Sequence, residues 1–486
     1  MSRPLSAALL LALALPARAQ KEAFDSSRAG PDEGLAAAAP ALALRRSDFP
    51  RRFIWGAATA AYQVEGGNKN SDLWDWERRR GWERSGAAVD SFRMVEEDVR
   101  LLRELGVNAY RFSIEWGRVM PAPGRFDESA LAYYDKLIGL LEGSGIAPIV
   151  TIHHFTNPRW FWKRHPKGWS DPSAIDDYAA FVEVLARRYA GRVDRWVTFN
   201  EPMGYLMNGY VAGNFPPGER SVGLKLPADF MPAVRNIALA HRRAYRLIHA
   251  ADPRPEVQVG LVQNPSPVFP WKDEARQRAA AARWDHFFHW NLLDAAAGGA
   301  LDFDLDGKPD TTLDDGRPAL DFVGINYYSR VYVRDLPALQ PVRALPFYPE
   351  LRRTWLGRLV FALTGGRLGS GPKDDGGREI YPDGLRLISR QAWDRYRLPI
   401  LITENGVDDA RDVLRAGYLR AHLRALKAAL DEGVRIVGYI HWSLMDNYEW
   451  GSYEPKFGLY RVDRENGFRR SPTAGSRAFR DFLKGP

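Results

Sequence analysis

Short apolar segments alternate with amphipathic segments along the chain from Phe53 onwards. Each apolar segment is bounded by turn-forming or polar residues, which is typical of strands buried on both faces of a parallel sheet. Two of these segments end in the same way, at Glu201 and at Glu404. The pattern predicts buried strands at residues 53–59, 108–114, 147–152, 196–199, 257–262, 322–328, 400–403 and 436–441.

The amphipathic segments between these strands carry apolar residues at helical spacing. Val95, Val99 and Leu102, for example, fall on one face of a helix that Gly106 stops. The same spacing predicts helices at residues 92–102, 131–141, 175–189, 228–250, 274–297, 413–430 and 472–483.

The alternation of strands and helices favours a closed (β/α)8 barrel, the TIM-barrel fold, as a single domain at residues 48–486. An open doubly wound sheet is the alternative, but no glycine-rich phosphate turn follows any strand. A long insertion at 330–379 follows the sixth strand, and so long a loop is usually functional or disordered. Its apolar, arginine-flanked part at 355–361 is a lid, an interfacial segment, or a loop packed on the barrel.

The N-terminus has the features of an export signal. Arg3 precedes an apolar run from Leu5 to Leu15, which is too short to span a bilayer. The sequence Ala17-Arg18-Ala19 then predicts cleavage before Gln20. We therefore expect a signal peptide at 1–19, a flexible linker at 20–47 and a secreted or periplasmic protein; the alternative is a fortuitously apolar N-terminus.

Composition narrows the possible chemistry. The absence of cysteine excludes disulfides, Cys-ligated zinc, thiol catalysis and a lipoprotein anchor. The formal charge of +8 predicts an arginine-rich solvated surface, and no motif indicates nucleic-acid binding. Asp302, Asp304 and Asp306 resemble the first half of a calcium loop, but Leu313 stands where the closing Glu belongs. A structural Ca²⁺ and a plain acidic turn are both open, and no other metal is expected.

Glu201 and Glu404 occupy the tips of non-adjacent strands, where barrel enzymes place their chemistry. Hydrolysis of an acetal at neutral pH needs a proton donor for the leaving oxygen and a stabilised oxocarbenium-like state. Two carboxyls that flank the bond supply both, provided that one stays protonated and the other is ionised. Two Glu alone would be a weak indication, because ion pairs also place carboxylates at strand ends.

The sequences around these residues make the indication specific. Residues 198–202 (TFNEP) and 402–406 (ITENG) resemble the two signatures of glycoside hydrolase family 1, the retaining β-glycosidases. The segments 53–66, 110–114, 326–328 and 442–450 resemble further motifs of that family in the same order. The resemblance extends from Phe53 to Phe479, which is nearly the whole mature chain.

The resemblance implies a role for each matching residue. Glu201 would be the general acid/base and Glu404 the nucleophile, which Arg111 and Tyr328 would contact. Asn200 would bind the sugar 2-hydroxyl, and Trp442 would form the floor under the sugar ring. The remaining substrate-binding residues implied by the family are Gln63, His154, Asn326, Glu449 and Trp450, and no cofactor is implied.

The sequence departs from the family pattern at three places. Phe155, rather than Trp, follows the sugar-binding His, and Asp90-Ser91-Phe92 lacks a His in its middle. Arg378 stands where the family usually has a Trp that stacks on the leaving group. Together with the apolar 355–361 segment and the aromatic run 160–162, the replacement of that Trp by Arg378 predicts a bulky hydrophobic or amphiphilic aglycone. The alternative is that Arg378 pairs with a local acid such as Glu379.

Glu449 also bears on the choice of sugar. Phospho-glycosidases of the family have Ser in its place and a phosphate-binding Lys, where this chain has Pro455. A carboxylate would repel a 6-phosphate, so we predict a β-glucosidase-like enzyme for unphosphorylated small-molecule glycosides. β-Galactosides and β-fucosides are further candidate substrates. The alternatives are a transglycosidase, a phospho-sugar hydrolase and a non-catalytic sugar-binding barrel.

Overall fold

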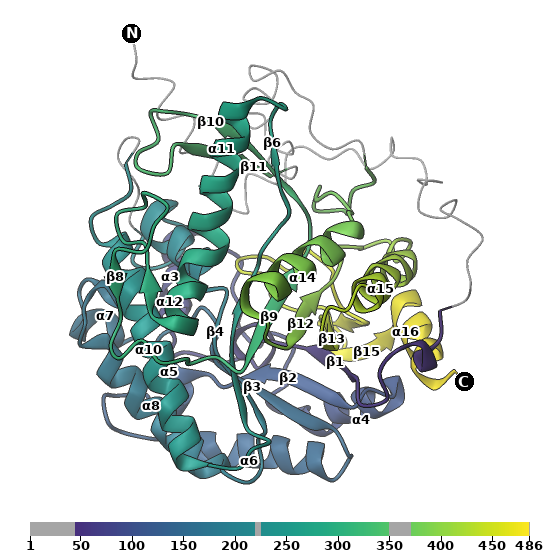
Figure 1. Cartoon of the computed structure of the whole chain (residues 1–486). Helices are drawn as coiled ribbons and strands as arrows, with labels where there is room; N and C mark the ends of the chain where they lie inside the picture. Colours follow the sequence, from purple (N-terminus) through teal and green to yellow (C-terminus); the bar gives the residue numbers. More distant parts are fainter. Residues whose placement is uncertain (1–43, 219–224, 349–370, 486) are drawn as a thin grey trace.

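The computed structural model describes residues 44–218, 225–348 and 371–485. Its centre is a closed barrel of eight parallel strands in the order β1-β13-β12-β9-β5-β4-β3-β2 (Figure 1). The strands are β1 (Ile54–Ala58), β2 (Ala109–Ser113), β3 (Ala147–His153), β4 (Arg195–Asn200), β5 (Gln258–Gln263), β9 (Phe322–Tyr327), β12 (Ile400–Asn405) and β13 (Ile436–Trp442). All eight predicted strands are confirmed, and the first pairs with the last in the register Ile54↔Gly438.

Helices surround the barrel on the outside (Figure 1). The longer ones are α4 (Val95–Leu105), α6 (Glu128–Glu142), α8 (Ala174–Tyr189), α10 (Phe230–Ala251), α14 (Asp383–Tyr396), α15 (Arg415–Asp431) and α16 (Ala474–Lys484). Their ends follow local chemistry: Asp127 caps α6 by accepting from the backbone N–H groups of Ser129 and Ala130. Gly106 ends α4 in the left-handed conformation, as the sequence predicted.

The predicted helix at 274–297 is not a single α-helix. It consists of α11 (Ala275–Trp284), a π-helical turn at Asp285–Trp290 and α12 (Asn291–Gly298). Shorter helical segments follow the barrel strands: α2 (Ala61–Val64), α3 (Asp72–Arg80), α5 (Trp116–Val119), α7 (Phe161–Arg164), α9 (Pro202–Leu206), η4 (Gly168–Ser170) and η5 (Met207–Val211). These short segments line the carboxyl end of the barrel, where the candidate residues lie.

The described part of the 330–379 insertion is more regular than the predicted loop. β10 (Val331–Asp335) and β11 (Ala344–Phe347) form a three-stranded sheet with β6 (Val268–Pro270), next to α11 (Figure 1). The apolar part at 355–361 lies outside the described residues, and so do residues 1–43. Two small hairpins complete the fold: β7 (Ala300–Leu301) with β8 (Thr311–Thr312), and β14 (Tyr460–Asp463) with β15 (Arg469–Pro472).

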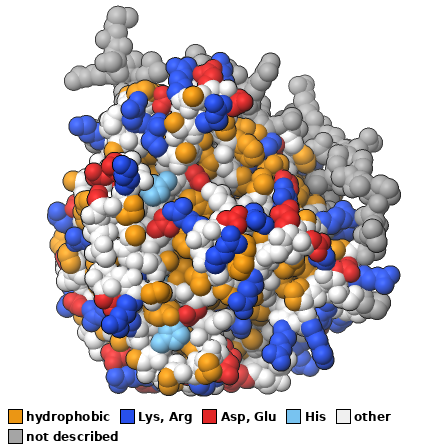
Figure 2. Space-filling model, viewed as in Figure 1, with side chains coloured by type: hydrophobic (Ala, Val, Ile, Leu, Met, Phe, Trp, Pro, Cys, Tyr) orange, Lys and Arg blue, Asp and Glu red, His pale blue; other side chains and the backbone are white. Residues whose placement is uncertain are grey.

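The ends of the described chain meet on one side of the barrel. The 3-10 turn η3 (Arg46–Asp48) lies beside α16, where Arg46 donates to the carbonyl of Leu483 at 3.0 Å (Figure 1). Over the face seen in Figure 2, Lys and Arg are interspersed with Asp and Glu, as expected for a solvated surface. Within the described ranges, no helix has the length and apolar character needed to cross a membrane.

Candidate active site

The two carboxyl groups lie at the carboxyl ends of β4 and β12. Glu201 follows β4 directly and has a left-handed backbone (φ +43°), and Pro202 then begins α9. Glu404 lies within β12, where the pairing with β9 shifts register between Ile402 and Glu404. Left-handed residues and register shifts re-aim side chains at strand ends, and they cluster at functional sites.

Asn326, from β9, connects the two acidic strand ends. Its amide nitrogen donates to Glu201 Oε1 at 2.7 Å and to Asn200 Oδ1 at 3.1 Å. Its amide oxygen accepts from the Thr403 hydroxyl, next to Glu404, at 2.7 Å. The orientation of Asn326 is thus fixed from both sides, and Asn326 holds the Glu201 carboxyl in one place.

Glu404 is 3% exposed and receives a donor on each carboxyl oxygen. The guanidinium of Arg111, from β2, donates to Oε1 at 2.7 Å, and the Tyr328 hydroxyl donates to Oε2 at 2.7 Å. Arg111 also donates to Asn200 Oδ1 at 2.6 Å and to the Thr151 hydroxyl at 3.0 Å, so its position is constrained on two sides. The predicted contacts of Arg111 and Tyr328 with Glu404 are present.

The environments of the two carboxyls differ in charge. Burial, together with the nearby Glu404 charge, raises the pKa of Glu201 to about 8. Burial also raises the pKa of Glu404, but the Arg111 cation and the Tyr328 hydroxyl act against that rise. Because only Glu404 has an ion-pair partner at 2.7 Å, we assign the proton to Glu201 and the negative charge to Glu404 at neutral pH.

The remaining predicted sugar-binding side chains lie around this pair. His154 follows β3, and its Nε2 accepts from the Asn200 amide at 3.1 Å. Its ring lies nearly parallel to those of Trp442 and Trp450, with centroids 6.0 and 5.8 Å away. Trp442 Nε1 in turn donates to Glu449 Oε1 at 3.2 Å. Burial raises the pKa of Glu449 to about 7.

Two buried polar atoms in this group have no hydrogen-bond partner within the described chain: Gln63 Oε1 and His154 Nδ1. The amide nitrogen of Gln63 is already engaged, because it donates to Asn447 Oδ1 and to the Tyr448 carbonyl, both at 2.9 Å. Burial lowers the pKa of His154 well below its usual value, so the ring is neutral. Since buried polar groups without partners are costly, these atoms are suited to hydroxyl groups of a ligand.

The family model described as Glycosyl hydrolase family 1 matches residues 45–484. The chain belongs to glycosyl hydrolase family 1. Enzymes of this family are retaining β-glycosidases and need no cofactor. The matched range covers the whole barrel, together with every strand that carries a predicted catalytic residue.

Relatives and solved structures agree with the family assignment. "Beta-glucosidase 13" from Arabidopsis thaliana is 33% identical over 485 residues, which cover 90% of this chain and 93% of that protein. "Beta-galactosidase" from Pyrococcus woesei is 31% identical, over 85% of this chain and 93% of that one. The "beta-glycosidase from Pyrococcus horikoshii" superimposes with a TM-score of 0.78 at 32% identity, covering 90% and 95% of the two chains. A Thermotoga maritima family 1 enzyme "complexed with a cyclophellitol analogue transition state mimic" gives a TM-score of 0.79 at 29% identity, covering 90% and 98%.

Two of the departures from the family 1 pattern can be located. Phe155 has a left-handed backbone (φ +72°), and its ring contacts Trp450 with a centroid separation of 4.9 Å. Arg378 forms an ion pair with Asp374 at 3.5 Å and lies over the rings of Tyr328 and Phe457, at 5.9 and 5.2 Å. The expected alternative partner, Glu379, instead binds Arg330 with two contacts of 2.8 Å.

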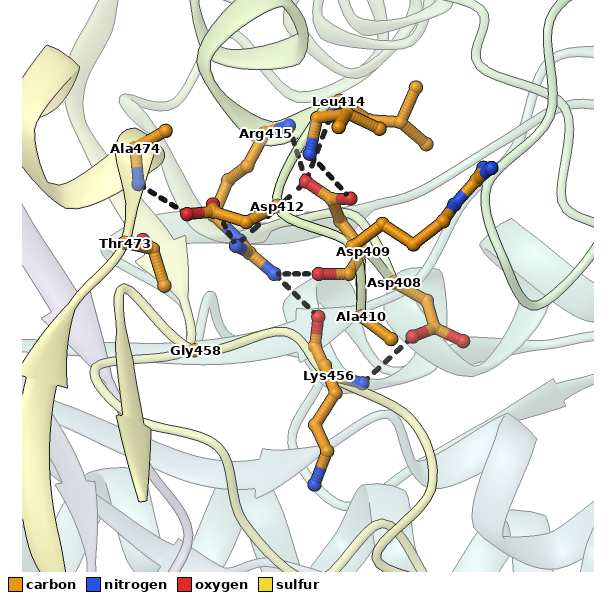
Figure 3. Close-up of polar contacts among 12 residues, drawn as sticks. Asp408, Asp409, Ala410, Asp412, Leu414, Arg415, Lys456, Gly458, Thr473 and Ala474 are labelled. Carbon is orange, nitrogen blue, oxygen red and sulfur yellow. Dashed lines mark hydrogen bonds and ion pairs between the residues drawn. The ribbon is translucent and has the colours of Figure 1, made fainter. Parts of the chain in front are cut away.

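Residues that the sequence analysis did not single out fix the segment after Glu404 (Figure 3). Arg415 is buried and donates to the carbonyls of Asp409 and Lys456 at 3.1 and 2.7 Å, and it forms an ion pair with Asp412 at 3.1 Å. Asp408 accepts from the backbone N–H of Lys456 at 2.7 Å. These bonds tie the loop after β12 to the loop after β13, which carries part of the sugar-binding set. The available sequence signal was three aspartates, Asp408, Asp409 and Asp412, among the seven residues before Arg415.

The predicted calcium ligands do not assemble as a set. Carboxylate oxygens of Asp302, Asp304 and Asp310 lie within 4.8 Å of one another, and Asp306 is not part of the group. One oxygen of Asp302 is engaged by His286 at 2.8 Å and by the Gly307 N–H at 2.9 Å. These contacts are those of an acidic turn closed by its own hydrogen bonds, and they give no evidence of a metal.

The pKa difference between the two carboxyls predicts a bell-shaped pH profile. Glu201 must be protonated to act as an acid, so kcat/KM for a glycoside with a poor leaving group should fall as the pH rises through about 8. At low pH, activity should fall as Glu404 becomes protonated. Because burial raises the pKa of Glu404, the midpoint of this fall should lie at a higher pH than the usual pKa of a glutamate. Activity that stays constant from pH 7 to 10 would contradict the assignment of Glu201 as the proton donor.

Proposed function

We propose that this family 1 enzyme releases a β-linked glucose unit from the non-reducing end of small glycosides, with β-galactosides as secondary substrates. The observation that carries the proposal is the contrast at the barrel mouth between Glu404, which the Arg111 cation contacts at 2.7 Å, and Glu201, which accepts from the neutral amide of Asn326 at 2.7 Å. Relatives named beta-glucosidase and beta-galactosidase support this choice of sugars.

In the first step of the proposed mechanism, a Glu404 oxygen attacks the anomeric carbon while Glu201 donates its proton to the leaving oxygen. The bond to the aglycone breaks and a glycosyl-enzyme forms. In the second step, Glu201, now ionised, takes a proton from water, and the water oxygen displaces Glu404 with overall retention. Asn200, whose amide Arg111 holds in place, is suited to contact the 2-hydroxyl next to the reacting carbon, and His154 offers its Nδ1, which has no partner among the described residues, to a neighbouring hydroxyl.

A panel of 4-nitrophenyl glycosides tests the proposal, with the anomeric product followed by NMR in the first minutes. We expect the β-glucoside to be cleaved fastest, with the β-anomer of glucose as the first product. Glucoside 6-phosphates should react poorly above pH 7, where Glu449, which accepts from the Trp442 indole, is ionised and its carboxylate repels phosphate. A preference for the 6-phosphate, or an α-anomer as first product, would refute the proposal.

We also propose that Arg378 shapes the leaving-group side of the site. Its position over Tyr328, a contact of Glu404, supports this, and a guanidinium can both stack and donate to oxygen atoms. Arg378→Trp should raise kcat/KM for cellobiose relative to octyl β-glucoside by roughly three- to tenfold, since a ring contact contributes about 0.5–1.5 kcal/mol. Arg397→Trp, at the end of α14, is the control. An unchanged ratio in the Arg378 variant would exclude this role.

Export remains part of the proposal. The charged, apolar and Ala-x-Ala parts of residues 1–19 support a cleaved signal peptide, followed by a linker that ends near residue 47. N-terminal sequencing of protein from the native host should find Gln20 as the first residue, in a fraction outside the cytoplasm. An intact Met1 or Ser2 in cytoplasmic protein would exclude export by this route.

A further inference from the structure

A hollow of about 700 Å³ lies between the segments that follow β1, β2, β3 and β4. Trp76, Trp160 and Trp162 line it, together with four prolines and a polar rim that includes Asp75 and Arg159. None of the residues assigned to the active site is part of its lining. The run 160–162, expected near the leaving group, therefore contributes two of its rings to a different cavity, while Phe161 is fully buried.

The three indole rings are held in place by the fold. Each ring N–H donates to the protein: Trp76 to the Asn214 carbonyl at 2.6 Å, Trp160 to the Met120 carbonyl at 2.8 Å and Trp162 to a carboxylate oxygen of Asp72 at 2.8 Å. Since all three donors are satisfied, the rings need no rearrangement to offer apolar surface to a ligand.

Two glycines allow this packing. A Cβ atom at Gly168 would lie 2.2 Å from a ring carbon of Trp162, and one at Gly218 would lie 2.2 Å from Trp76. Both glycines have left-handed backbones, with φ of +56° and +83°. The rings therefore pack directly against main chain, as expected for side chains whose positions are set by the fold.

The rim offers hydrogen-bond donors and acceptors side by side. Arg159 forms an ion pair with Asp75 at 2.7 Å and keeps about half of its side chain exposed (52%). Asn70, Arg79 and Lys163 also line the hollow. Sugar hydroxyls both donate and accept, whereas an anion would meet the carboxylates of Asp72 and Asp75 in the same hollow. Fixed aromatic surface beside mixed polar groups is the usual composition of a small-molecule site.

We propose that this hollow is a second carbohydrate-binding site, which takes a neutral oligosaccharide with a sugar ring against the indole of Trp160. The site is close to the catalytic pocket. Phe215 contacts the ring of Trp450 at 5.9 Å on one side, and its neighbours Pro216 and Pro217 line the hollow on the other. An oligosaccharide bound there is kept near the barrel mouth, which raises the local concentration of chain ends.

The test is a calorimetric titration of full-length Glu201→Gln enzyme, which keeps the Glu404 carboxylate that pairs with the inhibitor's ammonium group, with cellotetraose in the presence of saturating deoxynojirimycin. The inhibitor occupies the position of the cleaved sugar, so cellotetraose binding that depends on Trp160 and Arg159 reports the hollow rather than the catalytic pocket. Trp160→Ala and Arg159→Ala, each in this background, should weaken that binding at least fivefold. Trp160→Phe should retain most of it, because an aromatic face remains. The matched control is Trp393→Ala on α14, which should bind like the parent.

Failure of the second site and failure of the proposed function can be told apart. Titration with deoxynojirimycin alone reports the catalytic pocket, and hydrolysis of 4-nitrophenyl β-glucoside by the same substitutions in otherwise wild-type enzyme reports correct folding. If Trp160→Ala does not fold, Arg159→Ala, which changes an exposed side chain, decides the question. No saturable binding in the blocked enzyme, or equal affinity in all variants, would overturn the proposal.

Discussion

Replacing Glu404 by alanine is expected to lower kcat for an aryl glucoside by roughly 10⁴–10⁶-fold, the range seen when one member of a covalent catalytic group is deleted. The cause is the loss of the atom that attacks the anomeric carbon, at the point where Arg111 and Tyr328 are arranged to hold a negative charge. Steady-state kinetics on 4-nitrophenyl β-glucoside measures the loss.

Added azide provides the decisive control. The small cavity left by the side chain lets azide attack from the face that the carboxylate occupied, so turnover should recover in part and the product should be the α-glycosyl azide. Glu404→Gln, which fills the space, should show the same loss without rescue, and its Tm should stay near that of the wild type. A β-azide from the alanine variant would assign the nucleophile to another residue.

The second large effect concerns Glu201. Glu201→Ala should lower kcat/KM by ~10²–10⁴-fold for a glycoside with an alkyl leaving group, because such a group departs only when it is protonated. For 2,4-dinitrophenyl glucoside, whose leaving group needs no proton, the first step should be almost unaffected. Comparing the two substrates in one variant distinguishes loss of proton donation from a general loss of correctly folded enzyme, which would lower both rates equally.

The second step of the reaction gives a matching control for Glu201. Without a base to activate water, the glycosyl-enzyme should accumulate on the activated substrate, visible as a burst of dinitrophenol. Azide, which needs no base, should then release it as the β-glycosyl azide, opposite in configuration to the product of Glu404→Ala. Equal losses on both substrates, with no burst, would remove Glu201 from the acid/base role.

The sequence was most informative about the barrel. Buried parallel strands appear as continuous apolar runs, so each of the eight could be located without knowledge of its neighbours. The small sheet formed by β6, β10 and β11 was not predicted, since its strands are short and β10 pairs with β6 across more than sixty residues, as in Val331↔Val268. The π-helical turn at Asp285–Trp290 was also missed, because its residues continue the helical apolar pattern on both sides.

The residues of the candidate site could be identified from the sequence, but the hydrogen bonds and ion pairs between them could not. Motif resemblance identified Glu201, Glu404 and Arg111, whereas the link through Asn326 and Thr403 depends on the register between β9 and β12. The partner of Arg378 is Asp374 rather than Glu379, because Glu379 is turned towards Arg330. Proximity in sequence could not decide between these acids, since only the folded chain fixes where each points.

Closure of the barrel has a consequence for folding kinetics. The barrel closes when β1 pairs with β13, two strands that lie close to opposite ends of the described chain. Contacts between residues so far apart in sequence form slowly. Arg111 comes from β2, Glu201 from the end of β4 and Glu404 from β12. A segment of the chain that folds before the others therefore does not contain all the catalytic residues. In a refolding experiment, enzymatic activity should therefore return only with the last structural phase, after helical circular dichroism has recovered.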